Sequence, residues 1–192
     1  MVRINRVTTR GGDAGQTSLG DGERVRKDNP RIEAIGLVDE SNATIGVLRL
    51  FTRDRPDIDG MLARIQNDLF DVGADLCIPG EGRDRLRLSD GQVLRLETEV
   101  TAMNVSLPAL TSFILPGGST GAAYAHMARV AVRRTERAVV RLDTFNPSIL
   151  RYMNRLSDHL FVLARVLNDN GSSDVLWVPG LTIPPKDGEC SE

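Results

Sequence analysis

Residues 146–171 read NPSILRYMNRLSDHLFVLARVLNDNG, and they carry the clearest secondary-structure signal in the chain. Asn146 is a suitable helix cap, Pro147 suits the first helical position, and Gly171 is a stop signal. The apolar residues between them recur at spacings of three and four, which places them on one face of a helix. The stretch therefore predicts a long amphipathic helix. Its apolar residues are Ile149, Met153, Leu156, Leu160, Leu163 and Leu167.

Four further segments show the same helical periodicity of apolar residues. One of them opens on Ser89 with Gln92 three residues later, which is the spacing of a capping box. Strand signals are weak, because the apolar run 175–178 is short and is cut off by a Pro-Gly pair. We therefore expect an all-α fold, a five-helix up-and-down bundle with short connections. The four segments span about residues 29–48, 56–78, 89–103 and 119–142.

The organisation along the chain indicates one domain, over residues 1–180. We expect a glycine-rich N-terminal loop over 1–28, a helical bundle over 29–170, and a flexible tail over 181–192. The chain has 192 residues, which is enough for one domain with a substantial core. It is 41% hydrophobic and 26% charged, and that balance is typical of an ordinary soluble protein.

The charge and the rare residue types argue against several classes of function. A net charge of −2 does not favour broad binding to nucleic acid or to anionic membranes. Two cysteines and two histidines are too few for a cysteine zinc site or a multi-histidine centre, so we assign no metal-ligating residue. No apolar run is long enough to cross a bilayer, and the first residues lack a signal-peptide core. We expect a cytoplasmic protein.

The segment 8–22, TTRGGDAGQTSLGDG, holds five glycines and three threonines. Glycine lets a backbone turn tightly and approach a ligand closely, and successive N–H groups can form an anion-binding nest. Arg10 and the later Lys27 add positive charge suited to phosphate. The alternative is a flexible terminal loop that binds nothing.

The helix expected over 119–142 carries an unusual charged face. Arg129, Arg133, Glu136 and Arg137 lie within an arc of roughly 100°, because residues three and four apart share a face. Three guanidinium groups and one carboxylate exceed what a solvated helix needs. The alternative is an exposed ladder of ion pairs.

Polar residues also interrupt two apolar stripes. Asp39 and Asn42 lie among the apolar positions of the first helix, and Asn154 lies among those of the last. Such groups must find partners or a ligand. An Asp39–Arg129 pair would satisfy both side chains, and the amide of Asn154 could hold a purine or a phosphate. A purely structural hydrogen-bond network is the alternative.

Phe113 precedes a Pro-Gly-Gly turn at 116–118. An aromatic residue in this position is either a core plug or a lid on a flat ligand. Its chemistry alone favours the core plug.

Six motifs, in the same order along the chain, resemble those of the PduO-type ATP:cob(I)alamin adenosyltransferases. The resemblance covers most of residues 7 to 170. Gly11 stands where the family pattern usually has threonine or serine. The motifs lie at residues 9–19, 27–36, 38–42, 113–118, 133–137 and 154–158.

The resemblance implies a homotrimer with ATP in a cleft between neighbouring subunits. It implies transfer of the 5′-deoxyadenosyl group of ATP to the cobalt of cob(I)alamin, with release of inorganic triphosphate. The N-terminal loop would wrap the triphosphate together with Mg²⁺. A cobalamin-dependent mutase is a possible acceptor of the product.

The resemblance also assigns roles to residues. Asp39 and Arg129 match a pair that holds the active site together. Phe113 matches an aromatic residue on the lower axial side of the corrin, which reverses the preference for a core plug. Residues that match the triphosphate loop are Thr9, Arg10, Gly11, Gly12, Thr17, Ser18 and Lys27. Residues in the second ATP-binding set are Arg133, Arg134, Thr135, Glu136, Arg137 and Asn154.

Three other functions compete with this interpretation. A different ATPase or kinase is one, although the chain lacks G-x-x-x-x-G-K-[ST] and a βαβ pattern. A helical scaffold that holds cobalamin without catalysis is the second. An RNA-binding bundle that uses the arginine face is the third, and an aromatic content of 4% speaks against it.

Overall fold

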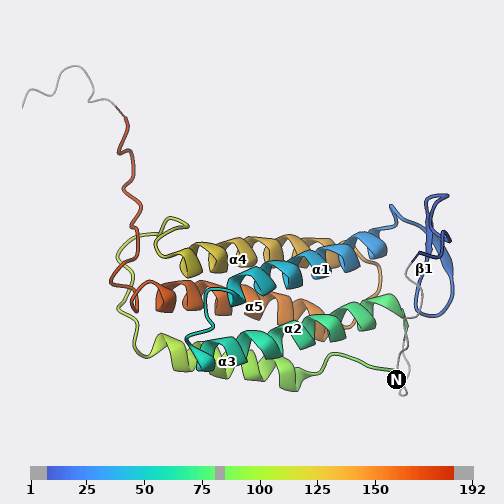
Figure 1. Cartoon of the computed structure of the whole chain (residues 1–192), viewed down its shortest axis with the longest axis horizontal. Helices are drawn as coiled ribbons and strands as arrows, with labels where there is room; N and C mark the ends of the chain where they lie inside the picture. Colours follow the sequence, from blue (N-terminus) through green and yellow to red (C-terminus); the bar gives the residue numbers. More distant parts are fainter. Residues whose placement is uncertain (1–7, 81–84, 184–192) are drawn as a thin grey trace, which may run out of the picture.

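A computed structural model describes residues 8–80 and 85–183. Five helices lie side by side, and each runs in the direction opposite to the one before it (Figure 1). The expected five-helix up-and-down bundle is therefore confirmed. The helices are α1 (Pro30–Arg49), α2 (Pro56–Cys77), α3 (Asp90–Asn104), α4 (Thr120–Val139) and α5 (Pro147–Leu167).

The start of each helix follows from its cap residues. The side chain of Asn29 accepts a hydrogen bond from the backbone of Arg31, and Pro30 occupies the first turn of α1. Asn146 caps α5 in the same way, through Ser148 N at 3.0 Å. The capping box expected at the start of α3 is present, since Gln92 Oε1 accepts from Ser89 N at 2.9 Å. These local bonds satisfy donors that a helix leaves free at its first turn.

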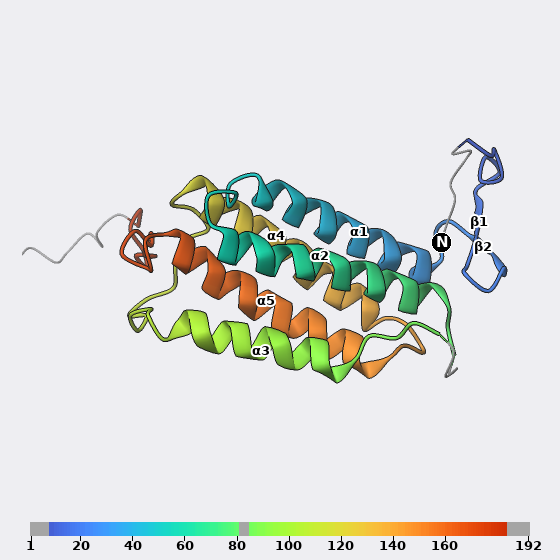
Figure 2. The same cartoon turned by 60° about the horizontal axis from the view of Figure 1, so that its bottom comes forward.

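Residues from all five helices form the buried core, and Figure 2 shows the helices lying side by side around it. α1 packs on α2 and α4, and α5 packs on α3 and α4. The apolar stripe expected for α2 is fully buried, and the stripe of α5 is buried up to Leu163. Burial of that many aliphatic side chains is the main stabilising contribution to the fold. The buried stripe of α2 consists of Ile58, Leu62, Ile65, Leu69, Val72 and Leu76.

One feature differs from the expectation. The N-terminal loop contains a small antiparallel hairpin, β1 (Gln16–Ser18) with β2 (Arg24–Arg26). The run 175–178 makes a single bridge, between Leu176 and Ile114, and does not extend into a strand.

Among the described residues, no helix is long and apolar enough to cross a membrane. Of the tail expected over 181–192, residues 184–192 lie outside the described part, as does Cys190.

Candidate functional site

The N-terminal hairpin gives the glycine-rich segment a defined shape. Gln16 pairs with Arg26 and Ser18 with Arg24 across the two strands. Arg24 then reaches back, donating from Nη2 to the carbonyl of Gly11 at 2.8 Å and from Nη1 to Ser18 Oγ at 3.2 Å. A guanidinium group thus ties the loop before β1 to the strand β2, so the loop is folded and ordered by its own contacts.

Lys27 and Gly12 approach each other closely within this loop. A Cβ atom placed on Gly12 would lie 3.0 Å from Lys27 Nζ and 3.1 Å from its Cε. At Gly11, by contrast, the nearest atom would be 3.7 Å away, which is ordinary contact. The missing side chain at residue 12 therefore leaves the space in which the Lys27 ammonium lies. Arg10 has φ of 60°, the left-handed region that non-glycine residues enter at a cost.

The hairpin is attached to the end of α2. Gly20 N donates to the carbonyl of Cys77 at 2.9 Å, and a Cβ on Gly20 would come within 2.6 Å of Ile78 Cγ1. Only a glycine permits this close approach. The turn between the strands contains Gly22, with φ of 92°. The hairpin is therefore held against the bundle at its turn.

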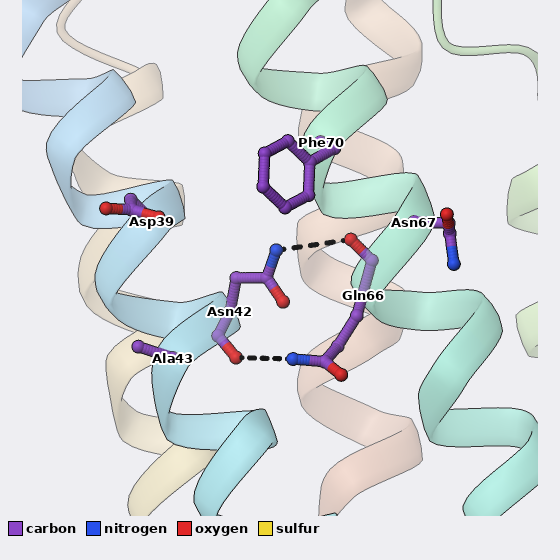
Figure 3. A pocket seen from close by; sticks show the side chains of 6 residues that line it. All are labelled: Asp39, Asn42, Ala43, Gln66, Asn67 and Phe70. Carbon is purple, nitrogen blue, oxygen red and sulfur yellow. Dashed lines mark hydrogen bonds between the residues drawn. The ribbon is translucent and has the colours of Figure 1, made fainter. Parts of the chain in front are cut away.

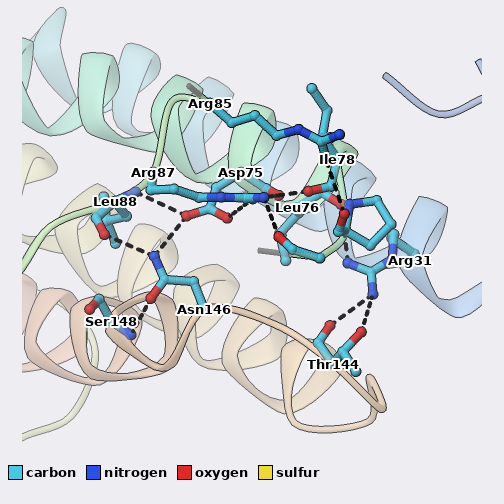
Figure 4. Close-up of polar contacts among 12 residues, drawn as sticks. Arg31, Asp75, Leu76, Ile78, Arg85, Arg87, Leu88, Thr144, Asn146 and Ser148 are labelled. Carbon is cyan, nitrogen blue, oxygen red and sulfur yellow. Dashed lines mark hydrogen bonds and ion pairs between the residues drawn. The ribbon is translucent and has the colours of Figure 1, made fainter. Parts of the chain in front are cut away.

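A polar network fixes the end of the bundle beside the hairpin (Figure 4). Asp75 accepts hydrogen bonds from Arg87, from the backbone of Leu88 at 2.9 Å and from Asn146 Nδ2 at 2.8 Å. Arg31, at the start of α1, donates to the carbonyl of Leu76 at 3.1 Å and to that of Thr144 at 2.8 Å. The network joins α1, α2 and the α4–α5 connection into one support for the hairpin.

The cationic face of α4 has two kinds of arginine. Arg134 pairs with Glu40 of α1, whereas Arg133 and Arg137 are exposed and make no hydrogen bond or ion pair within residues 8–80 and 85–183. Glu136 accepts from Asn154 Nδ2 at 3.1 Å, which joins α4 to α5 at this face. Two guanidinium groups are thus available for an anion from outside the chain.

Arg129 lies one turn before Arg133 on α4, and it is less exposed. Its Nε is buried and has no hydrogen-bond partner in the part of the chain that the structure describes. Burial lowers the pKa of this guanidinium, and the neighbouring charge of Arg133 lowers it further. A buried cationic group without an acceptor is costly, so this side chain is incomplete in the isolated chain.

Thr135 is a correction to the expected site. Its side chain is fully buried between α1 and α4. The hydroxyl lies 2.8 Å from Ser41 Oγ and 2.9 Å from the carbonyl of Leu37. The expectation that this side chain contacts ATP is wrong, because its hydrogen-bonding capacity is used between the helices.

Asp39 borders a groove of about 330 Å³ between α1 and α2 (Figure 3). Asn42 Nδ2 donates to the backbone carbonyl of Gln66 at 3.2 Å, and Gln66 Nε2 donates back to that of Asn42 at 3.1 Å. The Asn42 Oδ1 atom is buried without a partner among the described residues. The exposed ring of Phe70 also lines the groove.

The described chain contains no Asp39–Arg129 ion pair. Asp39 is exposed at the α1–α2 groove, and no hydrogen bond to its carboxylate is formed within the described ranges. The pairing that sequence reasoning suggested is therefore not made inside one chain. The buried Nε of Arg129 is left without an acceptor among the described residues, whereas the exposed carboxylate of Asp39 faces solvent.

Phe113 lies in the loop between α3 and α4, at the end of the bundle away from the hairpin, and is 78% exposed. The core-plug interpretation is therefore wrong. Its ring meets that of Trp177, with centroids 6.0 Å apart and planes tilted by 55°. Nothing in the local sequence around Phe113 indicates this contact, so Trp177 was missed as a neighbour of the site.

The expected site residues fall into groups that one chain does not bring together. The hairpin carries Thr9, Gly11, Thr17, Ser18 and Lys27 at one end of the bundle, and the loop with Phe113 lies at the other (Figure 1). Helix α4 runs between the two ends, and 20 residues of helix span about 30 Å. One chain therefore keeps the hairpin and the loop with Phe113 apart.

Resident metal ligands are not found in the described part of the chain, where no three His, Cys, Asp or Glu side chains gather. Mg²⁺ usually binds through one or two carboxylates together with the phosphates of a nucleotide.

These features define a class: a five-helix bundle with a folded, cationic glycine-rich hairpin and free arginines on one helix. The model of the cobalamin adenosyltransferase family matches residues 7–167. The chain is 51% identical over 180 residues to a cobalamin adenosyltransferase of Cupriavidus metallidurans, covering 91% of this chain and 95% of that protein. It is 45% identical over 187 residues to a corrinoid adenosyltransferase of Mycobacterium bovis, covering 93% and 96%.

A solved structure has the same fold. It is a variant of a PduO-type ATP:corrinoid adenosyltransferase from Lactobacillus reuteri in complex with cobalamin and ATP. The TM-score is 0.84 at 33% identity, over 90% of this chain and 99% of that one. The chain belongs to the cobalamin adenosyltransferase family.

Proposed function

We propose that this protein transfers the 5′-deoxyadenosyl group of ATP to the cobalt of cob(I)alamin and releases inorganic triphosphate. Family membership supports the proposal, and so do the relatives whose names state corrinoid adenosyltransferase activity. The observation that carries it is the set of cations without acidic partners in the described chain: Lys27 on the hairpin, and Arg133 and Arg137 on α4. A polyphosphate would satisfy these groups.

The reaction is a displacement at carbon. The cobalt electron pair attacks the C5′ atom of ATP, the Co–C bond forms, and the C5′–O bond breaks. Triphosphate leaves with the electron pair of that bond, and cobalt passes formally from the +1 to the +3 state. The nucleophile carries no proton, so the protein needs no general base. Its task is to position two substrates and to stabilise charge on the leaving group.

The N-terminal segment, residues 1–28, is the proposed triphosphate site of a single domain whose bundle spans 29–170. Backbone N–H groups of Gly11 and Gly12, the hydroxyls of Thr9, Thr17 and Ser18, and the cations of Arg10 and Lys27 would bind the phosphates. Mg²⁺ would enter bound to ATP. Charge grows on the triphosphate in the transition state, so these contacts strengthen as the bond breaks.

The second set of contacts would come from α4 and α5. Arg133 and Arg137 are free to approach phosphate, and Arg134, Glu136 and Asn154 border them. The contacts of Glu136 with Asn154 would hold the arginine face in place while ATP binds. Arg133 is the residue we propose to act on the leaving group.

We propose a homotrimer with active sites at the subunit interfaces. The hairpin and Phe113 lie at opposite ends of one chain, and both Asp39 and Arg129 lack a partner in the described residues. An Asp39–Arg129 pair between neighbouring subunits would satisfy a half-buried guanidinium and place the cationic face of α4 near the hairpin of another copy. Such an interface would complete the site.

Phe113 would lie on the lower axial side of the corrin. An exposed ring of this kind keeps a base off the cobalt, which favours the four-coordinate cob(II)alamin that is reduced before transfer. We further propose a cytoplasmic enzyme whose product passes to a cobalamin-dependent mutase.

The test is a single incubation. The purified protein is mixed with MgATP and chemically reduced cobalamin, adenosylcobalamin is followed optically, and triphosphate is quantified. We expect the two products in equal amounts. Release of ADP and phosphate without adenosylcobalamin would indicate an ATPase, and cobalamin binding without triphosphate would indicate a scaffold; either result overturns the proposal.

A further inference from the structure

Three buried polar side chains meet at the end of α5, far from the hairpin. Arg165 Nε donates to Asp174 Oδ2 at 2.8 Å, and Asn168 Nδ2 donates to Asp174 Oδ1 at 3.2 Å. The side chains of Arg165 and Asp174 are only 6% and 4% exposed. A buried ion pair fixes geometry through its directed hydrogen bonds even where its net stabilisation is small. We call these three residues the α5 hub.

The α5 hub holds both ends of the loop that carries Phe113. Arg165 Nη2 donates to the carbonyl of Pro108 at 2.7 Å, and Asn168 Oδ1 accepts from Ser119 N at 2.9 Å. At Gly118, with φ of 95°, a Cβ would overlap the Asn168 side chain. The loop from Pro108 to Ser119 is therefore anchored at its two ends by the same buried cluster.

The segment after the hub holds the middle of that loop. We call residues 175–178 the C-terminal strap. Leu115 N donates to the carbonyl of Val175 at 2.7 Å, and Trp177 N donates to that of Phe113 at 2.8 Å. Ser112 Oγ donates to the carbonyl of Trp177 at 2.7 Å. The strap thus fixes the backbone on both sides of Phe113.

The ring of Phe113 is held by less. It is 78% exposed, and Trp177 is the one aromatic ring it meets among the described residues. A tilted pair with centroids 6.0 Å apart is a favourable aromatic geometry. An exposed ring without such a neighbour samples several rotamers. Trp177 is itself 44% exposed, whereas a tryptophan that only packs against the core is usually more buried.

We infer that Trp177 is a positioning residue for Phe113: its ring sets the orientation in which Phe113 meets the corrin, and the C-terminal strap is part of the active site. The inference rests on the proposed function. Trp177 acts through Phe113, so its removal lowers the fraction of four-coordinate cob(II)alamin while the triphosphate site, at the other end of the chain, is unaffected.

The experiment compares Trp177→Ala, Trp177→Leu and Trp177→Phe in the full chain. Cob(II)alamin is bound with saturating MgATP, and electron paramagnetic resonance gives the four-coordinate fraction. We expect Trp177→Ala and Trp177→Leu to lower this fraction by about two- to tenfold, the range that loss of one aromatic pair permits. Trp177→Phe keeps a flat ring, so it should retain most of the wild-type fraction. The affinity for ATP and the melting temperature stay at wild-type values.

Two controls separate positioning from other roles. Leu181→Ala removes an exposed apolar side chain shortly after the strap and leaves the fraction unchanged. In a Phe113→Ala background, Trp177→Ala has no further effect, because the group it positions is gone. An additive loss in that background, equal values for Trp177→Phe and Trp177→Leu, or a wild-type fraction in all three variants overturns the inference.

Failure of the proposed function is seen separately. A wild-type protein that forms no adenosylcobalamin from cob(I)alamin and MgATP contradicts the proposed reaction. An active wild type whose four-coordinate fraction is unaffected by Trp177→Ala contradicts only the role of Trp177.

Discussion

The two ends of the bundle are built differently. At the hairpin end, Lys27, Arg133 and Arg137 are charged groups without acidic partners among the described residues. At the Phe113 end, an apolar ring is held by a strap whose anchor, the Arg165–Asp174 pair, is buried and complete. Within one chain the support of Phe113 is complete, whereas no described acidic side chain pairs with these three cations.

This difference separates two tasks. Under the proposed function, binding a polyphosphate needs cations whose desolvation costs little free energy and few carboxylates that compete for them. These cations therefore remain exposed until ATP binds. Under the proposed function, a ring placed against the corrin needs a fixed orientation, and the support of Phe113 is buried. Substitutions at one end should therefore spare the ligand of the other end, and the following changes test that separation.

The largest effect is expected at Lys27. Lys27→Ala should lower kcat/KM for adenosyl transfer by about 100-fold or more, because a cation that stabilises the leaving group acts mainly in the transition state. Steady-state assays over MgATP concentration measure it. Arg26→Ala is the matched control, since Arg26 is exposed and pairs with Asp28. If Lys27→Ala also weakened the binding of cobalamin in the absence of ATP, the two ends would not act separately.

The next effect concerns assembly. Asp39→Ala and Arg129→Ala should each shift the oligomer towards monomers by about tenfold, and the Asp39→Arg, Arg129→Asp double variant should recover part of the association. Sedimentation velocity gives the distribution. Asp57→Asn, an exposed carboxylate in the first turn of α2, should leave it unchanged. If both single variants associate like wild type, the pair does not lie between subunits.

A smaller effect tests the geometry of the hairpin. Gly12→Ala should weaken ATP binding by about tenfold, because the added methyl group displaces the Lys27 ammonium from its position 3.0 Å away. Gly11→Ala, where the nearest atom is 3.7 Å from the new Cβ, should change the affinity by less than about twofold. Calorimetric titration with MgATP compares the two. Equal losses would show that Lys27 does not depend on this space.

The smallest effect is a pH dependence near the Phe113 end. Both ring nitrogens of His126 are buried without partners among the described residues, and burial, then the charge of Arg129, lowers its pKa. Between that lowered value and about 6.5 the unfolded chain binds more protons, so stability falls as pH falls through 6.5.

Replacing the imidazole isolates this contribution. His126→Leu should remove up to about 1.4 kcal/mol per pH unit from the slope of unfolding free energy between pH 6.5 and 5. Urea unfolding at several pH values measures both slopes. Identical slopes in wild type and variant would mean that the imidazole is not kept neutral by its surroundings; the nearby carboxylate of Asp174, which raises the pKa, would then dominate.

The helices could be predicted from the sequence because their signals are local. Caps such as Asn29 and Asn146 lie beside the helices they start, and the stripe of α2 is buried as its spacing indicates. The hairpin was missed, since its strands of three residues are too short to show an alternation. Asp21-Gly22, a favoured turn pair, was the available signal.

The candidate site was predicted less completely. Thr135 lies between two charged residues, which hides that it continues the buried positions of Ala128 and Val132 at helical spacing. The loop that carries Phe113 contacts a strap far along the chain, since Ser112 bonds to Trp177, 65 residues later. Long-range contacts of this kind leave no periodic signal near either segment.

The hydrogen bonds of Arg31 affect the order in which the chain folds during synthesis. One of its acceptors, the carbonyl of Thr144, lies 113 residues further along the chain. During translation α1 can form early. The hydrogen bond from Arg31 at its start to Thr144, however, forms only after most of the polypeptide has left the ribosome. The bond from Gly20 N to the carbonyl of Cys77 can form earlier, so the hairpin contacts α2 before Arg31 joins α1 to the α4–α5 connection.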